Sequence, residues 1–171
     1  ERVSALTGEK GEEGWVSTFH SMCARILRRD IDKLGYTRSF TIYDEDDQSA
    51  VLKEQLKHFN IDDKMLSVRE LKGKISDAKN KLLSPDEWFR QSEKDVRCQQ
   101  IHVIYDGYET RLKASNALDF DDLLVRTLEL FADHPPVLES YRERFRYVHV
   151  DEYQDTNFAQ YTLVKLITKN S

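Results

Sequence analysis

Residues 146–155 read RYVHVDEYQD, in which branched and aromatic residues lead directly into two adjacent carboxylates. A short apolar run of this kind is typical of a buried strand in a parallel sheet, and such sheets bind ligands beyond the carboxyl ends of their strands. Asp151 would then lie at the strand tip, where a carboxylate can hold a hydrated magnesium ion. Glu152 could orient, or accept a proton from, the water that attacks a terminal phosphate. The stretch therefore predicts a nucleotide-hydrolysing α/β domain, although many strands end in a carboxylate that only faces water.

The composition sets wide bounds on the class of protein. The chain has 171 residues, of which 39% are hydrophobic, enough for one domain or for a small domain and part of another. Its net charge of −5 gives no sign of nucleic-acid binding, so any contact with phosphates must come from a local patch. Cys23 and Cys98 lack the spacing of metal ligands, which predicts free thiols. No apolar run approaches the roughly 20 residues that span a bilayer, so we expect a cytoplasmic protein.

Periodicity and capping residues divide the chain into short elements. We expect residues 15–19 to form a buried strand and residues 21–34 to form a helix that ends at Gly35. Residues 40–43 are expected to form another short strand. Further helices are predicted from Asp44 to about Asn60, from Ser67 to Lys81, from Ser84, from Lys94 to Ala114, from Asp119 to Pro135, over 137–145, and from Asn157 to Ile167.

The distance between the strands at 15–19 and 146–150 indicates an insertion. About 130 residues separate them, whereas a plain crossover between parallel strands needs about a dozen or more. The intervening helices should therefore form an inserted subdomain.

Three segments, in this order along the chain, resemble motifs of one protein family. They are residues 17–29 (STFHSMCARILRR), 118–124 (LDFDDLL) and 151–157 (DEYQDTN). The last of them is similar to the second motif, the Walker B region, of superfamily 1 DNA helicases of the UvrD/PcrA/Rep type. The other two resemble that family's TFHS and LDFDDLL segments. The likeness extends over essentially the whole chain and concerns the PcrA branch in particular.

The resemblance implies an α/β fold that is predominantly helical. We expect a partial P-loop NTPase (RecA-like) parallel sheet with an inserted all-α subdomain. Residues 1–43 and 118–171 would belong to the RecA-like ATPase domain, and residues 44–117 would form the insertion.

The same resemblance implies the motor core of an ATP-dependent 3′-to-5′ DNA helicase that serves DNA repair or replication. Its cofactors would be ATP and Mg²⁺, and its partners single-stranded DNA, duplex DNA at a fork and accessory repair proteins, in the cytoplasm and nucleoid of a bacterium. Asp151 would bind Mg²⁺ and Glu152 would activate water, and both would be nucleotide-binding residues. Gln154 would be a catalytic residue that links this site to neighbouring motifs.

The sequence contains no phosphate-binding string of the form GxxxxGK[ST]. We therefore expect it to be an internal part of a longer protein and, by itself, not to hydrolyse ATP. Two alternatives stay open: a non-catalytic module that binds DNA or a partner protein, and the motor part of a helicase-nuclease subunit.

Thr18, His20 and Ser21 are candidates for contact with single-stranded DNA. At an expected junction between strand and helix, their side chains and free backbone amides would face an anionic phosphodiester. The alternative is that Thr18 and Ser21 only cap the helix and His20 only packs. The family resemblance favours the DNA contact, and Phe19 is expected in the core.

Residues 64–81 form the most basic window of the chain. Such a patch can hold duplex phosphates without sequence preference. We take Lys74, Lys79 and Asn80 as candidate duplex contacts, because residues 73–80 also resemble a family segment. The equal alternative is an ordinary lysine-rich surface. The arginines at 25, 28 and 29 are better explained as a solvated helix face.

Asp119, Asp121 and Asp122 could be mistaken for metal ligands. Helix capping and solvation explain them better, since the first turn of a helix favours acidic residues. Phe120 could stack on a DNA base, but its place on the apolar stripe favours the core.

Overall fold

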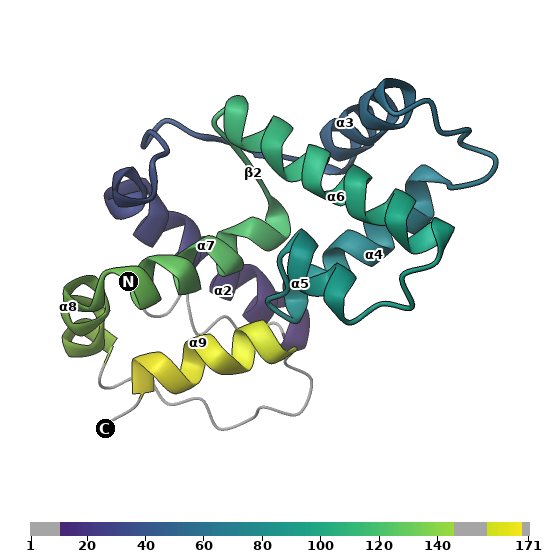
Figure 1. Cartoon of the computed structure of the whole chain (residues 1–171). Helices are drawn as coiled ribbons and strands as arrows, with labels where there is room; N and C mark the ends of the chain where they lie inside the picture. The colour runs from purple at the N-terminus through teal and green to yellow at the C-terminus, as the bar shows by residue number, and fades with distance from the viewer. Residues whose placement is uncertain (1–10, 146–156, 169–171) are drawn as a thin grey trace.

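The computed structural model describes the backbone of residues 11–145 and 157–168, and the side chains of residues 19–143 and 157–168. Within these ranges the chain is mostly helical and contains one two-stranded parallel sheet (Figure 1). The prediction of a predominantly helical α/β fold is confirmed. The strand predicted at residues 146–150 and the carboxylates after it lie outside the described ranges.

The elements are, in chain order, α2 (Gly11–Asp30), a 3₁₀ turn η1 (Ile31–Leu34), β1 (Thr41–Tyr43), α3 (Glu45–His58), α4 (Val68–Asn80), α5 (Pro85–Arg90), α6 (Val96–Ala114), β2 (Ala117–Asp119), α7 (Phe120–Asp133), α8 (Pro135–Phe145) and α9 (Phe158–Thr168). None of these helices has both the length and the apolar character that a membrane crossing would need.

The strand predicted at residues 15–19 was wrong, because these residues belong to α2. Phe19 lies four residues before Cys23, and both side chains are buried. Phe19 therefore continues the helical stripe of Cys23, Ile26 and Leu27, with the spacing of one helix face. The apolar run at 15–19 reads equally well as an additional turn of that helix.

Local capping chemistry accounts for most helix starts, as predicted. The side chains of Asp44, Ser84 and Asp119 each accept the backbone N–H of the third helical residue, and that residue's carboxylate accepts the N–H of the cap. Ser67 and Asn157 cap α4 and α9 with one hydrogen bond each, in which the side-chain oxygen accepts a backbone N–H of the first turn. Gly35 ends the first helical segment with a φ of 85°, which glycine adopts without strain.

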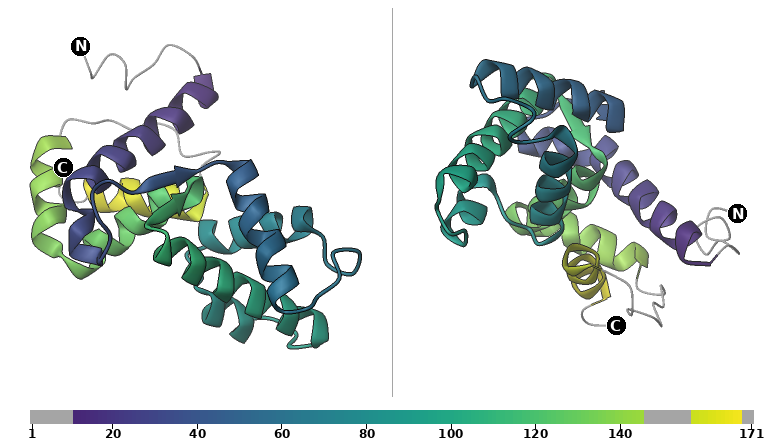
Figure 2. Two further views of the ribbon diagram at one scale, coloured as in Figure 1. Left: turned by 90° about the horizontal axis from the view of Figure 1, so that it is seen from above. Right: turned by 90° about the vertical axis from the view of Figure 1, so that its right-hand side faces the viewer.

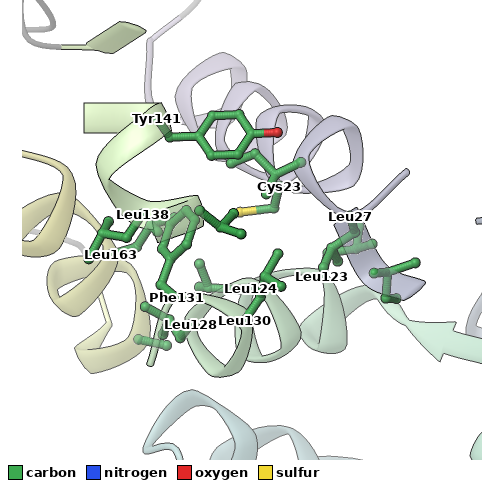
Figure 3. Packing of buried hydrophobic residues seen from close by; sticks show 14 of the residues in the cluster. Cys23, Leu27, Leu123, Leu124, Leu128, Leu130, Phe131, Leu138, Tyr141 and Leu163 are labelled. Carbon is green, nitrogen blue, oxygen red and sulfur yellow. The ribbon is translucent and has the colours of Figure 1, made fainter. Parts of the chain in front are cut away.

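The buried apolar residues form two separate cores. The first core lies among α2, α7, α8 and α9 and contains side chains such as Cys23, Leu27, Leu124, Tyr141 and Leu163 (Figure 3). The second core joins α3, α4 and α6 through side chains such as Leu52, Leu71, Ile75, Ile104 and Tyr108. The elements of the second core form the lobe at the right of Figure 1.

The elements of the first core form the first lobe and those of the second core form the second lobe, and the short sheet connects them. β1 pairs in parallel with β2, with Thr41 opposite Ala117 and Tyr43 opposite Asp119. The chain leaves the first lobe along β1 and returns beside it along β2, so residues 44–117 enter and leave at one place (Figure 2). We expected the strand at 40–43 but not β2, because Asp119 was interpreted as the start of the next helix and residues 118–124 as one motif segment.

Candidate functional site

Phe120 is exposed and stacks on His20, which corrects its expected place in the core. The ring centroids are 3.9 Å apart and the planes differ by 10°. Phe120 is 47% exposed, whereas His20 is 7% exposed. The apolar stripe of α7 begins at Leu123, and Phe120 in the first turn reaches beyond the core to cover the imidazole on α2. The pair thus presents an aromatic face to solvent.

α2 begins at Gly11, so the other candidates for single-stranded DNA contact are inside a helix. Only the first four amides of a helix lack partners, so the free amides expected near Thr18 and Ser21 do not arise from a helix start. The side chain of Ser21 is exposed. The structure describes Thr18 only by its helical backbone.

An open groove of about 640 Å³ adjoins Phe120. Its walls come from β1, the start of α3, the middle of α4 and the start of α7, and include Ile42, Tyr43, Lys72, Gly73, Ser76 and Phe120. A Cβ atom added at Gly73 would meet no heavy atom within 4 Å, so the groove is open at this point of its wall. The groove therefore lies between the two lobes, on the side where the aromatic pair faces solvent.

Lys79 is buried, which corrects its expected place on a basic surface. Its side chain is 2% exposed, and Nζ lies 2.6 Å from Asp119, 2.7 Å from Glu109 and 3.0 Å from Asp122. Arg126 completes this ion cluster at 3.0 Å from Glu109. An ammonium group enclosed by three carboxylates is not available to a DNA phosphate. Lys79 therefore belongs to the interior joint between the lobes.

Asp119 and Asp122 cap α7 as predicted, but solvation does not explain them, because both are almost fully buried. Burial and the negative charge of Asp119 raise the pKa of Asp122 to about 8. Burial opposes the charged form of Asp119, yet the ion pair with Lys79 holds its pKa below the ordinary value. Burial would lower the pKa of Lys79, but the surrounding carboxylates raise it well above its usual range.

Asn80 contacts the residue that ends the heptad 151–157. Its Oδ1 accepts a hydrogen bond of 3.1 Å from Nδ2 of Asn157, whose own Oδ1 accepts the backbone N–H of Gln160. The half-buried Asn80 amide is thus held inside the protein, whereas Lys74 on the same helix is exposed. Of the three candidate duplex contacts, only Lys74 faces solvent freely.

The rest of the basic window is mostly at the surface. Lys64, Arg69 and Lys81 are exposed, and Lys81 pairs with Asp77 at 3.1 Å.

Arg28 on α2 lies over the ring of Phe40 and donates to two backbone carbonyls, so it holds the loop before β1.

The described residues contain no group of three or more His, Cys, Asp or Glu side chains that could hold a metal ion. The carboxylates of the buried ion cluster are already paired with Lys79 and Arg126. Asp151, Glu152 and Gln154 lie outside the described residues. Their donor types suit a magnesium ion and an attacking water, and their roles stay predictions.

The model of the UvrD/REP helicase N-terminal domain matches residues 1–171 of this chain. The chain belongs to the UvrD/REP helicase family. It is 51% identical over 167 residues to "ATP-dependent DNA helicase PcrA" of Staphylococcus aureus (strain Mu50 / ATCC 700699), covering 98% of this chain. It is 50% identical over 166 residues to the protein of the same name in Staphylococcus epidermidis (strain ATCC 12228 / FDA PCI 1200), covering 97% of this chain. In both cases the match spans 23% of the relative's length.

Sequence reasoning missed Tyr108, Glu109, Arg126 and Asn157 as members of the joint between the lobes. One signal for Lys79 was present, because the apolar residues of α4 at 71, 75 and 78 lie on its buried side. That spacing marks one helix face, so a lysine at position 79 is expected to point inward.

Proposed function

We propose that this chain is part of the motor core of an ATP-dependent 3′-to-5′ DNA helicase, in which ATP hydrolysis drives movement along single-stranded DNA and duplex unwinding. The observation that carries the proposal is the family match over residues 1–171, together with the heptad at 151–157. The names of the relatives, which are ATP-dependent DNA helicases, support it. Roles in DNA repair or replication, accessory repair proteins and a place at the bacterial nucleoid belong to the same proposal.

The acidic part of the ATPase site is assigned to residues 151–154. Asp151 holds Mg²⁺, which when bound neutralises charge on the phosphates of ATP. Glu152 orients the attacking water and accepts its proton. Gln154 connects this site to neighbouring motifs by hydrogen bonds. The residue types and their spacing in the sequence support these roles.

The single-stranded DNA contact is assigned to the region of His20 and Phe120, with Ser21 and Thr18 beside them on α2. An exposed aromatic ring can stack on any base, which gives affinity without sequence choice. The stack of Phe120 on His20 fixes the ring in one orientation, and the adjacent groove leaves space for a strand. These observations support a base-stacking role for Phe120.

Residues 44–117 are assigned as the inserted helical subdomain, between two parts of the RecA-like domain at 1–43 and 118–171. The separate second core and the paired strands at its entrance support this division. On this subdomain, Lys74 is the remaining candidate for a phosphate of duplex DNA. The alternative for Lys74 is an ordinary solvated lysine.

The catalytic assignment is tested by Glu152→Gln in the full-length parent protein. We expect DNA-stimulated ATP hydrolysis to fall by a factor of about a hundred or more, because general base catalysis contributes about 10²–10⁴-fold. Binding of ATP and of single-stranded DNA should persist. The matched control is Glu143→Gln on α8, whose side chain is exposed. Hydrolysis near the normal rate in Glu152→Gln would remove the assignment.

A further inference from the structure

The last turn of α4 lies between two segments that carry different parts of the proposed machinery. Helix α4 packs against both α7 and α9. Two adjacent residues in this turn make polar contacts: Lys79 reaches the start of α7, and Asn80 reaches the start of α9. The contacts join residues 40 and 77 positions apart in the sequence.

The Lys79 contact fixes the first turn of α7. Oδ2 of Asp119 accepts hydrogen bonds from Lys79 at 2.6 Å and from the hydroxyl of Tyr108 at 2.8 Å. Oδ1 of the same carboxylate accepts the backbone N–H of Asp122 at 2.8 Å, which caps α7. Phe120 is the next residue after this cap. The position of the aromatic ring on His20 therefore depends on a carboxylate that Lys79 holds.

The Asn80 contact fixes the residue at the end of the heptad 151–157. Asn157 uses both atoms of its amide: Oδ1 caps α9, and Nδ2 donates to Oδ1 of Asn80. Asn80 also donates weakly to Ser76 one turn earlier, at 3.5 Å, so its amide is held on α4. The start of α9 is thus fastened to the same helical turn as the start of α7.

We propose that Lys79 and Asn80 are positioning residues that couple the DNA contact at Phe120 to the nucleotide site at 151–157. This inference rests on the function proposed above. Neither residue touches DNA or ATP: Lys79 acts through Asp119, and Asn80 acts through Asn157. Packed interiors and buried ion networks shift between discrete arrangements rather than deform gradually. A displacement at the Lys79 contact with Asp119 should therefore displace the Asn80 contact with Asn157, and the reverse.

Coupling of this kind has a measurable and reciprocal signature. If ATP changes the affinity for DNA by some factor, DNA changes the affinity for ATP by the same factor. The quantity to follow is the ratio of the Kd values for single-stranded DNA, without and with a non-hydrolysable ATP analogue, in the full-length parent protein. The midpoint of thermal unfolding is measured beside it, to separate coupling from loss of structure.

The first variant is Asn80→Leu, which keeps the branching of the side chain and removes both hydrogen bonds of the Asn80 amide, the one with Asn157 and the weak one to Ser76. We expect the ratio of Kd values to move toward one by roughly threefold or more, since residues between coupled sites modulate coupling by about this amount. Asn80→Asp keeps an oxygen that accepts from Asn157, and it should retain the ratio of the unmodified protein. The matched control is Asp77→Leu, in the same turn of α4, where the side chain is 62% exposed.

A second comparison asks whether the effect passes to Phe120. If it does, Asn80→Leu combined with Phe120→Leu changes the ratio no further than Phe120→Leu alone, because the two variants interrupt one connection. Independent effects that add would overturn the inference.

Two further results would also overturn it. One is a ratio in Asn80→Leu equal to that of the unmodified protein. The other is an equal loss in Asn80→Leu, Asn80→Asp and Asp77→Leu, which would indicate a general effect on structure. The proposed function fails separately, if the unmodified parent shows neither DNA-stimulated ATP hydrolysis nor any effect of the ATP analogue on DNA affinity.

Discussion

Nζ of Lys79 lies 2.6 Å from Oδ2 of Asp119, and both side chains are almost completely buried. The pair joins the end of α4 in one lobe to the cap of α7 in the other. Glu109 and Asp122 add two more carboxylates around the same ammonium group, and Arg126 balances part of their charge. A buried ion cluster is therefore part of the joint between the two hydrophobic cores.

Lys79→Met should loosen the start of α7, because it leaves the buried carboxylates without their central cation. Removing one partner of a buried ion pair costs about 3–5 kcal/mol, and we expect a loss of this size because Asp119 and Glu109 both lose their pairing with Lys79. The measurement is amide hydrogen exchange over residues 119–133 in the full-length parent.

The control for this prediction is Lys81→Met. Lys81 is 61% exposed and pairs with an exposed aspartate, so its loss should cost no more than about 1 kcal/mol. Equal protection of α7 in the two variants would show that the buried ion pair does not hold the helix.

The raised pKa of Asp122 makes the stability of this joint depend on pH. Its carboxyl has a pKa of about 8 when folded, against 3.8 for the ordinary side chain. Between these values the folded protein holds a proton that the unfolded chain has lost, so stability falls as pH rises from about 4 to about 8. The depressed pKa of Asp119 acts below this window, where stability is lost as pH falls through it. The ionisable groups packed around Asp122 are Lys79, Glu109, Asp119 and Arg126.

Asp122→Asn should therefore flatten the dependence of α7 protection on pH between 4 and 8. Hydrogen exchange over residues 119–133, corrected for the intrinsic pH dependence of exchange, reports this. Asp133→Asn, at the exposed end of the same helix, is the control and should keep the slope. An unchanged slope in Asp122→Asn would assign the titration to another group.

The local features of this fold were predictable because they depend on residues close together in the chain. Asp44, Ser84 and Asp119 each stand three residues before an acidic side chain, which is enough to predict a reciprocal cap. Gly35 as a helix end follows from the same local logic. The three motif segments similarly predicted the family that the comparisons confirm.

The buried ion cluster was not predictable in the same way. Lys79 lies in a window rich in lysine and arginine, where composition indicates a surface, and its partners are 30 to 43 residues further along the chain. Only the buried stripe at 71, 75 and 78 indicates that position 79 points inward. Phe120 shows the opposite error, because an apolar residue in the first turn of a helix can extend beyond the core.

Phe120→Ala should weaken binding of single-stranded DNA with little effect on folding. Stacking of one base on an aromatic side chain contributes about 1–3 kcal/mol, so the Kd should rise roughly fivefold to a hundredfold. The ring is 47% exposed, and its main neighbour is His20. A 2-aminopurine base in the strand measures stacking directly, through quenching of its fluorescence.

The control for the aromatic ring is Phe158→Ala, because Phe158 is 57% exposed at the start of α9. Its removal should leave the Kd and the quenching unchanged. If both variants bind DNA as the unmodified protein does, Phe120 is not a stacking platform.

Lys74→Ala separates a phosphate contact from an ordinary solvated lysine. Each phosphate neutralised on duplex DNA contributes about 0.9 to the slope of log K against log salt concentration. If Lys74 binds one phosphate, the variant should reduce that slope by about one and weaken binding similarly for different duplex sequences. Lys57→Ala, an exposed lysine on α3 of the same lobe, is the control. An identical slope in Lys74→Ala and the unmodified protein would identify Lys74 as a solvated side chain, and the exposed Lys64 and Arg69 would be the residues to test next.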